Sequence, residues 1–153
     1  MLKIIKNNIF NIKNREYDEC TPRLDCTAHD AAVAALEAAE AELETAETNL
    51  TNAQDLEGKL SEEMSKTQEM LDNCKSVYDT LSSVGSTVAN PNNMGEMTSM
   101  IECISNYGSN VDQAHHQAQN EVQRCQSEVN RCRRKVQNAQ QKVASTPCVW
   151  VCD

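Results

Sequence analysis

Residues 32–53 read AVAALEAAEAELETAETNLTNA, and residues 118–139 read AQNEVQRCQSEVNRCRRKVQNA. In both stretches, apolar or small residues return every seven positions in two rows that lie three and four residues apart. This spacing is typical of the contact face of a coiled-coil helix. It predicts an all-α fold, a long antiparallel helical hairpin (two-helix coiled coil) that can dimerise into a four-helix bundle.

The register of the hairpin follows from pairing residues whose numbers sum to 175. This register sets Leu43 opposite Cys132 and Leu50 opposite Cys125. Large side chains then face small ones, as good interdigitation requires. A shift of one heptad, to a sum of 168 or 182, would lose these particular pairs, so we expect the sum of 175 to describe the folded chain.

The charges beside the two rows support the same register. Glu40 falls near Arg133 on one flank of the seam, and Glu42 falls near Lys135 on the other. Opposite charges across a helical seam favour one orientation of the two helices over the reverse. We therefore expect these ion pairs to select the register more than to stabilise it.

The ends of the helices are marked by capping and turn residues. Thr27 and Asn93 are each followed three positions later by an acidic residue, the pattern of a capping box. The helices are therefore predicted at residues 27–84 and 93–145. Asparagine, glycine and proline concentrate between them and predict a turn at residues 85–92.

Two further segments flank the hairpin of residues 26–145. Residues 1–25 are predicted to form a basic amphipathic arm, since apolar side chains would share one helical face between lysines and asparagines. Contact between residues 1–15 and an anionic membrane is an alternative to packing along the hairpin, and packing is favoured. Residues 146–153 form a cysteine-containing tail.

Folding the hairpin brings four of the eight cysteines to one end. Two disulfides are predicted there, Cys26–Cys148 and Cys20–Cys152, because the register sets position 26 within one residue of position 148. A zinc site made by the same four cysteines is the alternative, and it gains weight in a reducing compartment. The spacing of the first two cysteines fits zinc poorly, so no metal site is assigned.

The other four cysteines lie within the helices. Cys125 and Cys132 occupy the small-residue row and are predicted to be core thiols that pack like alanine. Cys74 and Cys103 lie at similar distances from the turn and form a third candidate disulfide. Cys103, however, falls two residues beyond the seam residue Ile101, which turns it about 200° away on an ideal helix.

Polar residues interrupt the seam near its middle. Glu57 replaces a leucine of the repeat, and His115 occupies a seam position within reach of it. A buried pair of this kind can change charge near neutral pH and loosen the contact between helices. The alternative is a partly hydrated fault that a long coiled coil tolerates, and this alternative is favoured.

The apolar stripe widens toward the turn. A third row joins the two seam rows, and methionines gather on the returning helix. A two-helix seam cannot cover so broad a stripe, so these residues are candidate contacts for a partner. They are Met70, Val77, Val84, Met94, Met97, Met100 and Tyr107.

Composition narrows the classes of function. The net charge of −9 disfavours nucleic acid as a partner, because phosphates attract basic surfaces. The even number of cysteines favours an extracellular or other oxidising compartment, although the N-terminal residues do not resemble a signal peptide. No catalytic or phosphate-binding motif is present, so neither an enzyme nor a cofactor is expected.

The leading hypothesis is a structural or interaction protein without enzymatic activity. It would be a disulfide-braced coiled-coil hairpin that acts through self-assembly or through another helical protein. The first alternative is a secreted or injected helical effector or adaptor that binds a target or a membrane surface. The second alternative is a zinc protein with cysteine ligands.

Overall fold

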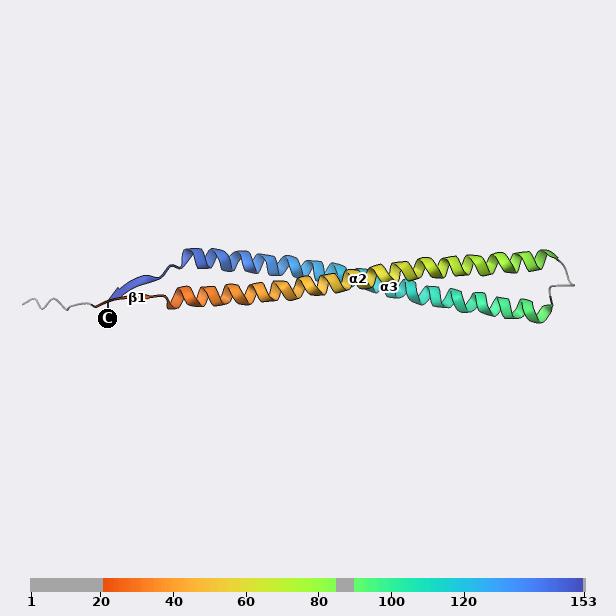
Figure 1. Cartoon of the computed structure of the whole chain (residues 1–153), viewed down its shortest axis with the longest axis horizontal. Coiled ribbons are helices and arrows are strands. Elements are labelled where there is room, and N and C mark those ends of the chain that lie inside the picture. The colour runs from red at the N-terminus through yellow and green to blue at the C-terminus, as the bar shows by residue number, and fades with distance from the viewer. Residues whose placement is uncertain (1–20, 85–89, 153) are drawn as a thin grey trace, which may run out of the picture. The chain divides into compact units, whose positions relative to one another are not determined.

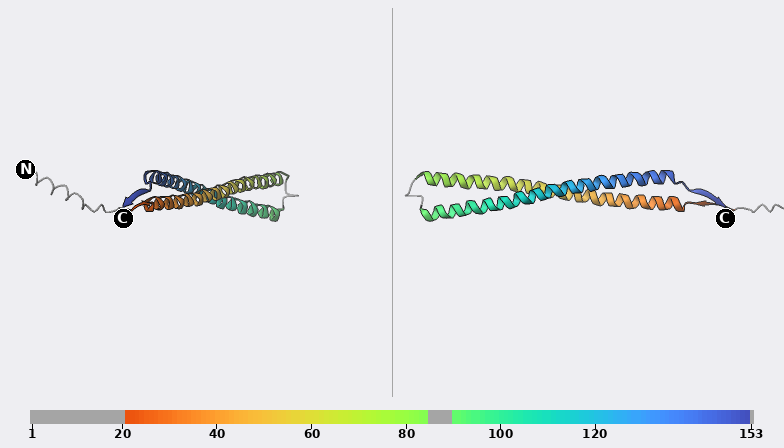
Figure 2. Two further views of the ribbon diagram at one scale, coloured as in Figure 1. Left: turned by 60° about the vertical axis from the view of Figure 1, so that its left-hand side comes forward. Right: turned by 180° about the vertical axis from the view of Figure 1, so that it is seen from behind.

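The structure is a computed structural model that describes residues 21–84 and 90–152. Its elements follow the order β1 (Pro22–Asp25), α2 (Thr27–Val84), α3 (Pro91–Ser145) and β2 (Val149–Cys152). The two helices lie side by side and run in opposite directions (Figures 1 and 2). The predicted all-α helical hairpin is therefore confirmed.

The chain divides into two compact units. The helical unit comprises Glu37–Asn138, and the terminal unit comprises the chain up to Leu36 together with Ala139–Asp153. The predicted N-terminal arm lies outside the described residues up to position 20.

The helical unit is held together by layers of large and small side chains. Val129 is fully buried and packs with Ala46 and Cys132, and Leu43 and Leu50 close over them. These contacts are the ones expected when residue numbers sum to 175. Complete burial of a valine side chain contributes about 1.5–3 kcal/mol. The heptad repeat therefore identified both the seam and its register.

One of the two predicted ion pairs forms, and the other is replaced. Lys135 donates to the carboxylate of Glu42 as expected. Arg133 lies 3.0 Å from Glu47 instead of Glu40, so that prediction is wrong. The reason is geometric, because a long side chain leans toward the N-terminus of its own helix. On α3 this direction carries Arg133 toward the acidic residue one heptad later on α2.

Both helix starts are capped by residues other than the predicted ones. At α2, the carboxylate of Asp25 accepts a 2.9 Å hydrogen bond from the Thr27 N–H. At α3, the side chain of Asn90 accepts a 3.0 Å hydrogen bond from the Asn92 N–H. Pro91 then occupies the first helical position, where the fixed φ of proline suits a helix and its missing N–H costs little.

The terminal unit contains a short two-stranded ribbon that the repeat did not predict. β1 pairs with β2 in antiparallel fashion, with Leu24 opposite Trp150 and Asp25 opposite Val149. These pairs sum to 174, one less than the pairs of the helical seam. An isolated two-stranded ribbon is marginal in water. The covalent and polar contacts beside it are therefore needed to hold it.

Candidate functional site

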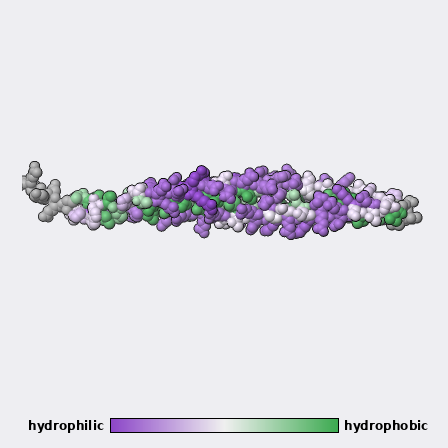
Figure 3. Space-filling model, turned by 90° about the horizontal axis from the view of Figure 1, so that it is seen from above, coloured by the Kyte–Doolittle hydropathy of each residue, from purple (hydrophilic) through white to green (hydrophobic). Residues whose placement is uncertain are grey.

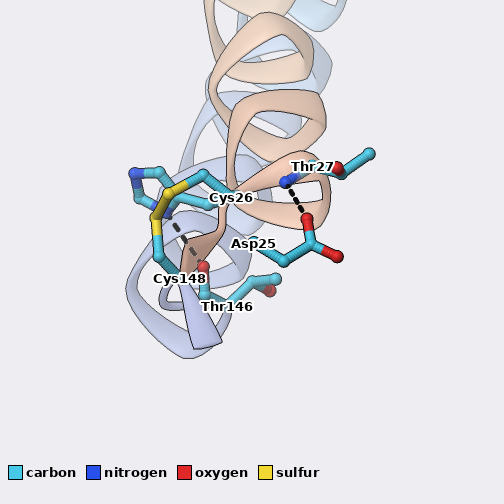
Figure 4. The surroundings of a disulfide bond; sticks show 6 residues. Asp25, Cys26, Thr27, Thr146 and Cys148 are labelled. Atoms are coloured by element: carbon cyan, nitrogen blue, oxygen red, sulfur yellow. Dashed lines mark hydrogen bonds between the residues drawn. A yellow bond between two sulfur atoms is a disulfide. The ribbon is translucent and has the colours of Figure 1, made fainter. Parts of the chain in front are cut away.

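The terminal unit is clamped by the disulfide between Cys26 and Cys148, which confirms one predicted pair (Figure 4). The bond joins residues 122 positions apart, at the point where α2 begins and the chain leaves α3. Beside it, His29 Nδ1 donates a 2.9 Å hydrogen bond to the carbonyl oxygen of Thr146. By the loop-entropy argument, closing a loop this long stabilises the fold by about 4–5 kcal/mol.

Only one cysteine of the second predicted bridge lies among the described residues. Cys152, in β2, is a disulfide-bonded residue, whereas Cys20 lies outside the described residues, so the pair Cys20–Cys152 stays a prediction. The Cys26–Cys148 bond uses two of the four thiols that the alternative zinc site would need. Among residues 21–84 and 90–152, no group of three or more His, Cys, Asp or Glu side chains is placed to hold a metal ion.

The third predicted bridge is wrong, because Cys74 and Cys103 are both free thiols. Cys74 is half-buried in the seam, and its sulfur lies 4.0 Å from the sulfur of Met100. Cys103 points out of the seam and is exposed. Its position two residues after a seam residue turns it away from the opposite helix, and the helix around it stays regular.

The two predicted core thiols are confirmed, with Cys125 3% exposed and Cys132 2% exposed. Both thiols belong to a repeated pattern of hydrogen bonds. In this pattern a glutamate carboxylate accepts from the arginine three residues later and from the thiol four residues later. Glu121 thus bonds Arg124 and Cys125, and the second set is Glu128, Arg131 and Cys132. Burial, together with the carboxylate of Glu121, raises the pKa of Cys125 and keeps this thiol protonated.

The mid-seam contact between Glu57 and His115 is present. His115 is 9% exposed, and its Nε2 lies 2.8 Å from Oε1 of Glu57. Glu57 keeps about a third of its side chain in solvent. The pair therefore satisfies the buried ring nitrogen with a partly hydrated carboxylate. The interpretation of this pair as pH-sensitive stays a hypothesis, and a partly hydrated contact stays the favoured interpretation.

The widened stripe divides into two groups of side chains. Met94 and Met97 are half-buried and belong to the seam side of α3. The remaining five residues are each 50–57% exposed. We call these five residues the apolar flank: Met70, Val77, Val84, Met100 and Tyr107.

The apolar flank lies along one side of the helical unit, on both helices. Met70, Val77 and Val84 share one heptad position of α2, and Met100 and Tyr107 share the matching position of α3. Hydrophilic side chains cover most of the face seen in Figure 3, and hydrophobic patches interrupt it. Five large apolar residues, all half-exposed and on one side of the two helices, are unusual for a surface that only meets water.

A hollow of about 380 Å³ opens within this flank. Met70 and Tyr107 line it from opposite helices, with Ile104 and the exposed Cys103 beside them. The Tyr107 hydroxyl donates a 2.9 Å hydrogen bond to Glu63 at its edge, and this bond raises the pKa of Tyr107. The hollow is therefore apolar inside and polar only at its rim. Met70 and Tyr107 were predicted as partner contacts, whereas Cys103 was predicted only as a disulfide candidate.

A larger and more polar groove of about 700 Å³ lies beside the seam and includes Gly108 in its lining. Serines from both helices form its walls, and the seam residues Met64, Leu71 and Ile104 form its floor. It holds Asp112 but none of the cysteines or histidines. Its polar lining thus consists of hydroxyl and amide side chains together with the carboxylate of Asp112.

In residues 21–84 and 90–152, neither helix has an apolar stretch long enough to cross a lipid bilayer. Two regions, each in its own unit, are candidate interaction sites: the disulfide-clamped terminal ribbon and the apolar flank of the helical unit.

Comparison of the chain with protein families, with curated proteins and with solved structures gives no match.

Proposed function

We propose that this chain is an interaction protein without enzymatic activity, a disulfide-braced helical hairpin that assembles with itself or with another helical protein. The observation that carries the proposal is the apolar flank. Its five side chains are large, half-exposed and aligned on both helices. Exposed apolar patches of this kind mark sites of protein contact.

The rest of the helical unit supports a role in presenting this flank. Its seam between residues 37–60 and 115–138 is closed by buried small side chains and flanked by ion pairs. Such a seam keeps two helices in one register and so holds residues of both helices at a constant spacing. A rigid scaffold lowers the entropic cost of binding, because few groups must be ordered on contact.

The proposal is tested by the size of the protein when it is isolated gently from its natural source. We expect an assembly heavier than the 17.0 kDa monomer. Replacing an exposed flank residue, as in Val77→Glu, should release the monomer while the helical circular dichroism is kept. Leu56→Glu is the matched control, since Leu56 has the same heptad position and exposure but lies outside the flank. A monomer in both the unmodified protein and the variants would refute the proposal.

A second candidate function rests on the terminal ribbon. Trp150 is 72% exposed, and Leu24 and Val149 are each about half exposed on the same short ribbon. Exposed tryptophan suits the boundary between a membrane and water. The ribbon therefore favours an effector or adaptor that binds a membrane surface or a target protein.

Trp150 provides the test of this second candidate, because it is the only tryptophan in the chain. Binding to vesicles that contain anionic lipid should shift its fluorescence to shorter wavelength. The variant Trp150→Phe, with vesicle flotation as the readout, should bind less than the unmodified protein. Unchanged emission, together with failure to float, would exclude the membrane surface as a partner.

A further inference from the structure

The two halves of the helical unit differ in how completely their side chains cover the seam. We call residues 37–60 and 115–138 the closed half, and residues 64–84 and 91–111 the open half. The closed half buries small seam residues on both helices, including Ala39, Ala53, Ala118, Cys125 and Cys132. Among the described residues of the open half, Thr67 and Val111 are the only two that are buried. Its seam residues are larger and stay partly in solvent.

Two helices alone cannot cover a stripe of three apolar rows. The open half carries such a stripe, because the apolar flank adds a row to the two seam rows on each helix. Helices with three apolar rows are typical of four-helix bundles, whereas two rows suffice for a two-helix seam. The open half therefore presents half of a bundle core.

We propose that a second copy of this chain completes this core, with the apolar flanks of the two copies packed face to face. This inference rests on the proposed function and names its partner. A two-fold contact places the same surface of both copies together, so a suitable surface must match itself. The flank meets this condition, because an uncharged apolar surface attracts an identical one.

The area of the flank fits a stable dimer. Half of the surface of five large side chains is roughly 500 Å² per copy, so two copies would bury about 1,000 Å² of apolar surface. A standard interface buries about 1,600 Å² in all, of which roughly 60% is apolar. The two estimates agree, and the polar remainder would come from the rim of the flank.

Charge provides an independent signature of this contact. Each copy carries a net charge of −9, so two copies repel at long range. Salt screens that repulsion, with a screening length of about 8 Å at physiological ionic strength. An apolar contact between like-charged copies should therefore tighten as sodium chloride rises from low to physiological concentration. A partner attracted by charge would show the opposite trend.

The inference is tested by sedimentation velocity on the oxidised full chain over a wide range of concentrations. We expect a mass of 17.0 kDa at low concentration and twice that mass at high concentration. Val77→Glu and, separately, Met100→Glu should remain monomers throughout. Leu56→Glu should dimerise as the unmodified chain does. Circular dichroism of each variant verifies that the helices are retained.

Cys103 gives a second readout that needs no substitution. It is exposed, and it lines the same hollow as Met70 and Tyr107. Dimerisation should cover this thiol, so its rate of maleimide labelling should fall as protein concentration rises. In Val77→Glu the rate should not depend on concentration.

The outcomes separate this inference from the proposed function. A purified chain that stays monomeric at every concentration, or a dimer that both flank variants leave intact, overturns the inference. If the purified chain is monomeric but a larger assembly from the natural source is lost in Val77→Glu, the proposed function stands with a different partner. Monomers in both settings overturn both proposals.

Discussion

Thr67 and Gly108 face each other across the seam so closely that a Cβ on Gly108 would lie 3.2 Å from Cγ2 of Thr67. Thr67 cannot readily turn away, because it is buried and its hydroxyl donates a 2.8 Å hydrogen bond to the carbonyl oxygen of Glu63. Gly108 therefore permits a close approach of the two helices. Gly58 has no such neighbour, since a Cβ there would meet nothing within 4 Å.

The two glycines should respond differently to alanine. Gly58→Ala should raise the free energy of unfolding by about 0.5–1 kcal/mol, because alanine is the better helix former. Gly108→Ala should raise the free energy of unfolding by less, since Thr67 must move by a few tenths of an ångström. Thr67→Ser removes Cγ2 and keeps the hydroxyl. In the Thr67→Ser background, Gly108→Ala should therefore raise the free energy of unfolding as much as Gly58→Ala does. Urea denaturation of the unmodified chain and of the four variants, with Thr67→Ser alone as the reference for the double variant, measures these changes. An equal gain in stability at both glycines would contradict the close approach.

Val129 and Val77 form a matched pair for testing the core. Val129→Ala should lower the free energy of unfolding by about 2 kcal/mol, because the side chain is fully buried between Leu43 and Leu50. Val77→Ala should change it by less than about 0.5 kcal/mol, because half of Val77 is in solvent. Both values are measured at a concentration where the chain is monomeric. Similar losses at the two sites would argue against the described seam.

Reduction should weaken the fold substantially. The Cys26–Cys148 bond joins residues 122 positions apart, and reducing it opens this loop in the unfolded chain. Loss of this bond alone should lower the free energy of unfolding by about 4–5 kcal/mol, and full reduction should lower it by at least that much. Urea denaturation with and without a phosphine reductant measures the difference. Coincident curves would show that the bond contributes nothing to stability.

The four free thiols of residues 21–84 and 90–152 should react in a definite order with a maleimide. Cys103 is exposed and should react first, and the half-buried Cys74 should follow. Cys125 and Cys132 should react only after unfolding, since both are buried and burial raises the pKa of Cys125. Peptide mapping by mass spectrometry after timed labelling gives the order. Early labelling of Cys125 in the folded chain would contradict its place in the core.

Stability should decline in acid partly through two glutamates of α3. Hydrogen bonds from Arg124 and Arg131 hold the pKa of Glu121 and of Glu128 below the ordinary value of 4.5. The folded state therefore binds these protons less readily than the unfolded state does. The stabilising contribution is complete above about pH 4.5 and is lost as the pH falls through the lower folded values.

The double variant Glu121→Gln/Glu128→Gln should lose less stability in acid. Its free energy of unfolding should fall less between pH 6 and pH 3 than that of the unmodified chain. Urea denaturation at several pH values provides the comparison, and salt should reduce the difference because both pairs are exposed. A steeper decline in the variant would reverse the sign of the argument.

The helices could be predicted from the sequence because their signal is long and repetitive. Each seam row recurs over several heptads, so errors at single positions such as Glu57 do not obscure the pattern. The register was predictable for a related reason, since large and small residues alternate between Leu43 and Cys132 and at the neighbouring layers.

The parts that could not be predicted depend on few residues. Each strand is four residues long, and β1 contains Pro22 and Asp25, which are uncommon in strands. Only the run Val149–Cys152 carries a strand signal of its own. At the start of α3, the pair Asn90 and Pro91 was the stronger signal, since it combines a capping side chain with proline at the first helical position.

The disulfide also bears on how the chain finds its fold. A repeat of seven residues looks nearly the same after a slip of one heptad, so misaligned hairpins compete during folding. In a hairpin slipped by one heptad, Cys26 would sit beside Gln141, seven residues before Cys148 in the chain. Disulfides need Cα atoms closer than about 7 Å, and the folded chain places them 4.3 Å apart. We therefore expect oxidation to fix the correct alignment covalently, whereas slipped molecules cannot form this bond and stay free to unfold and refold.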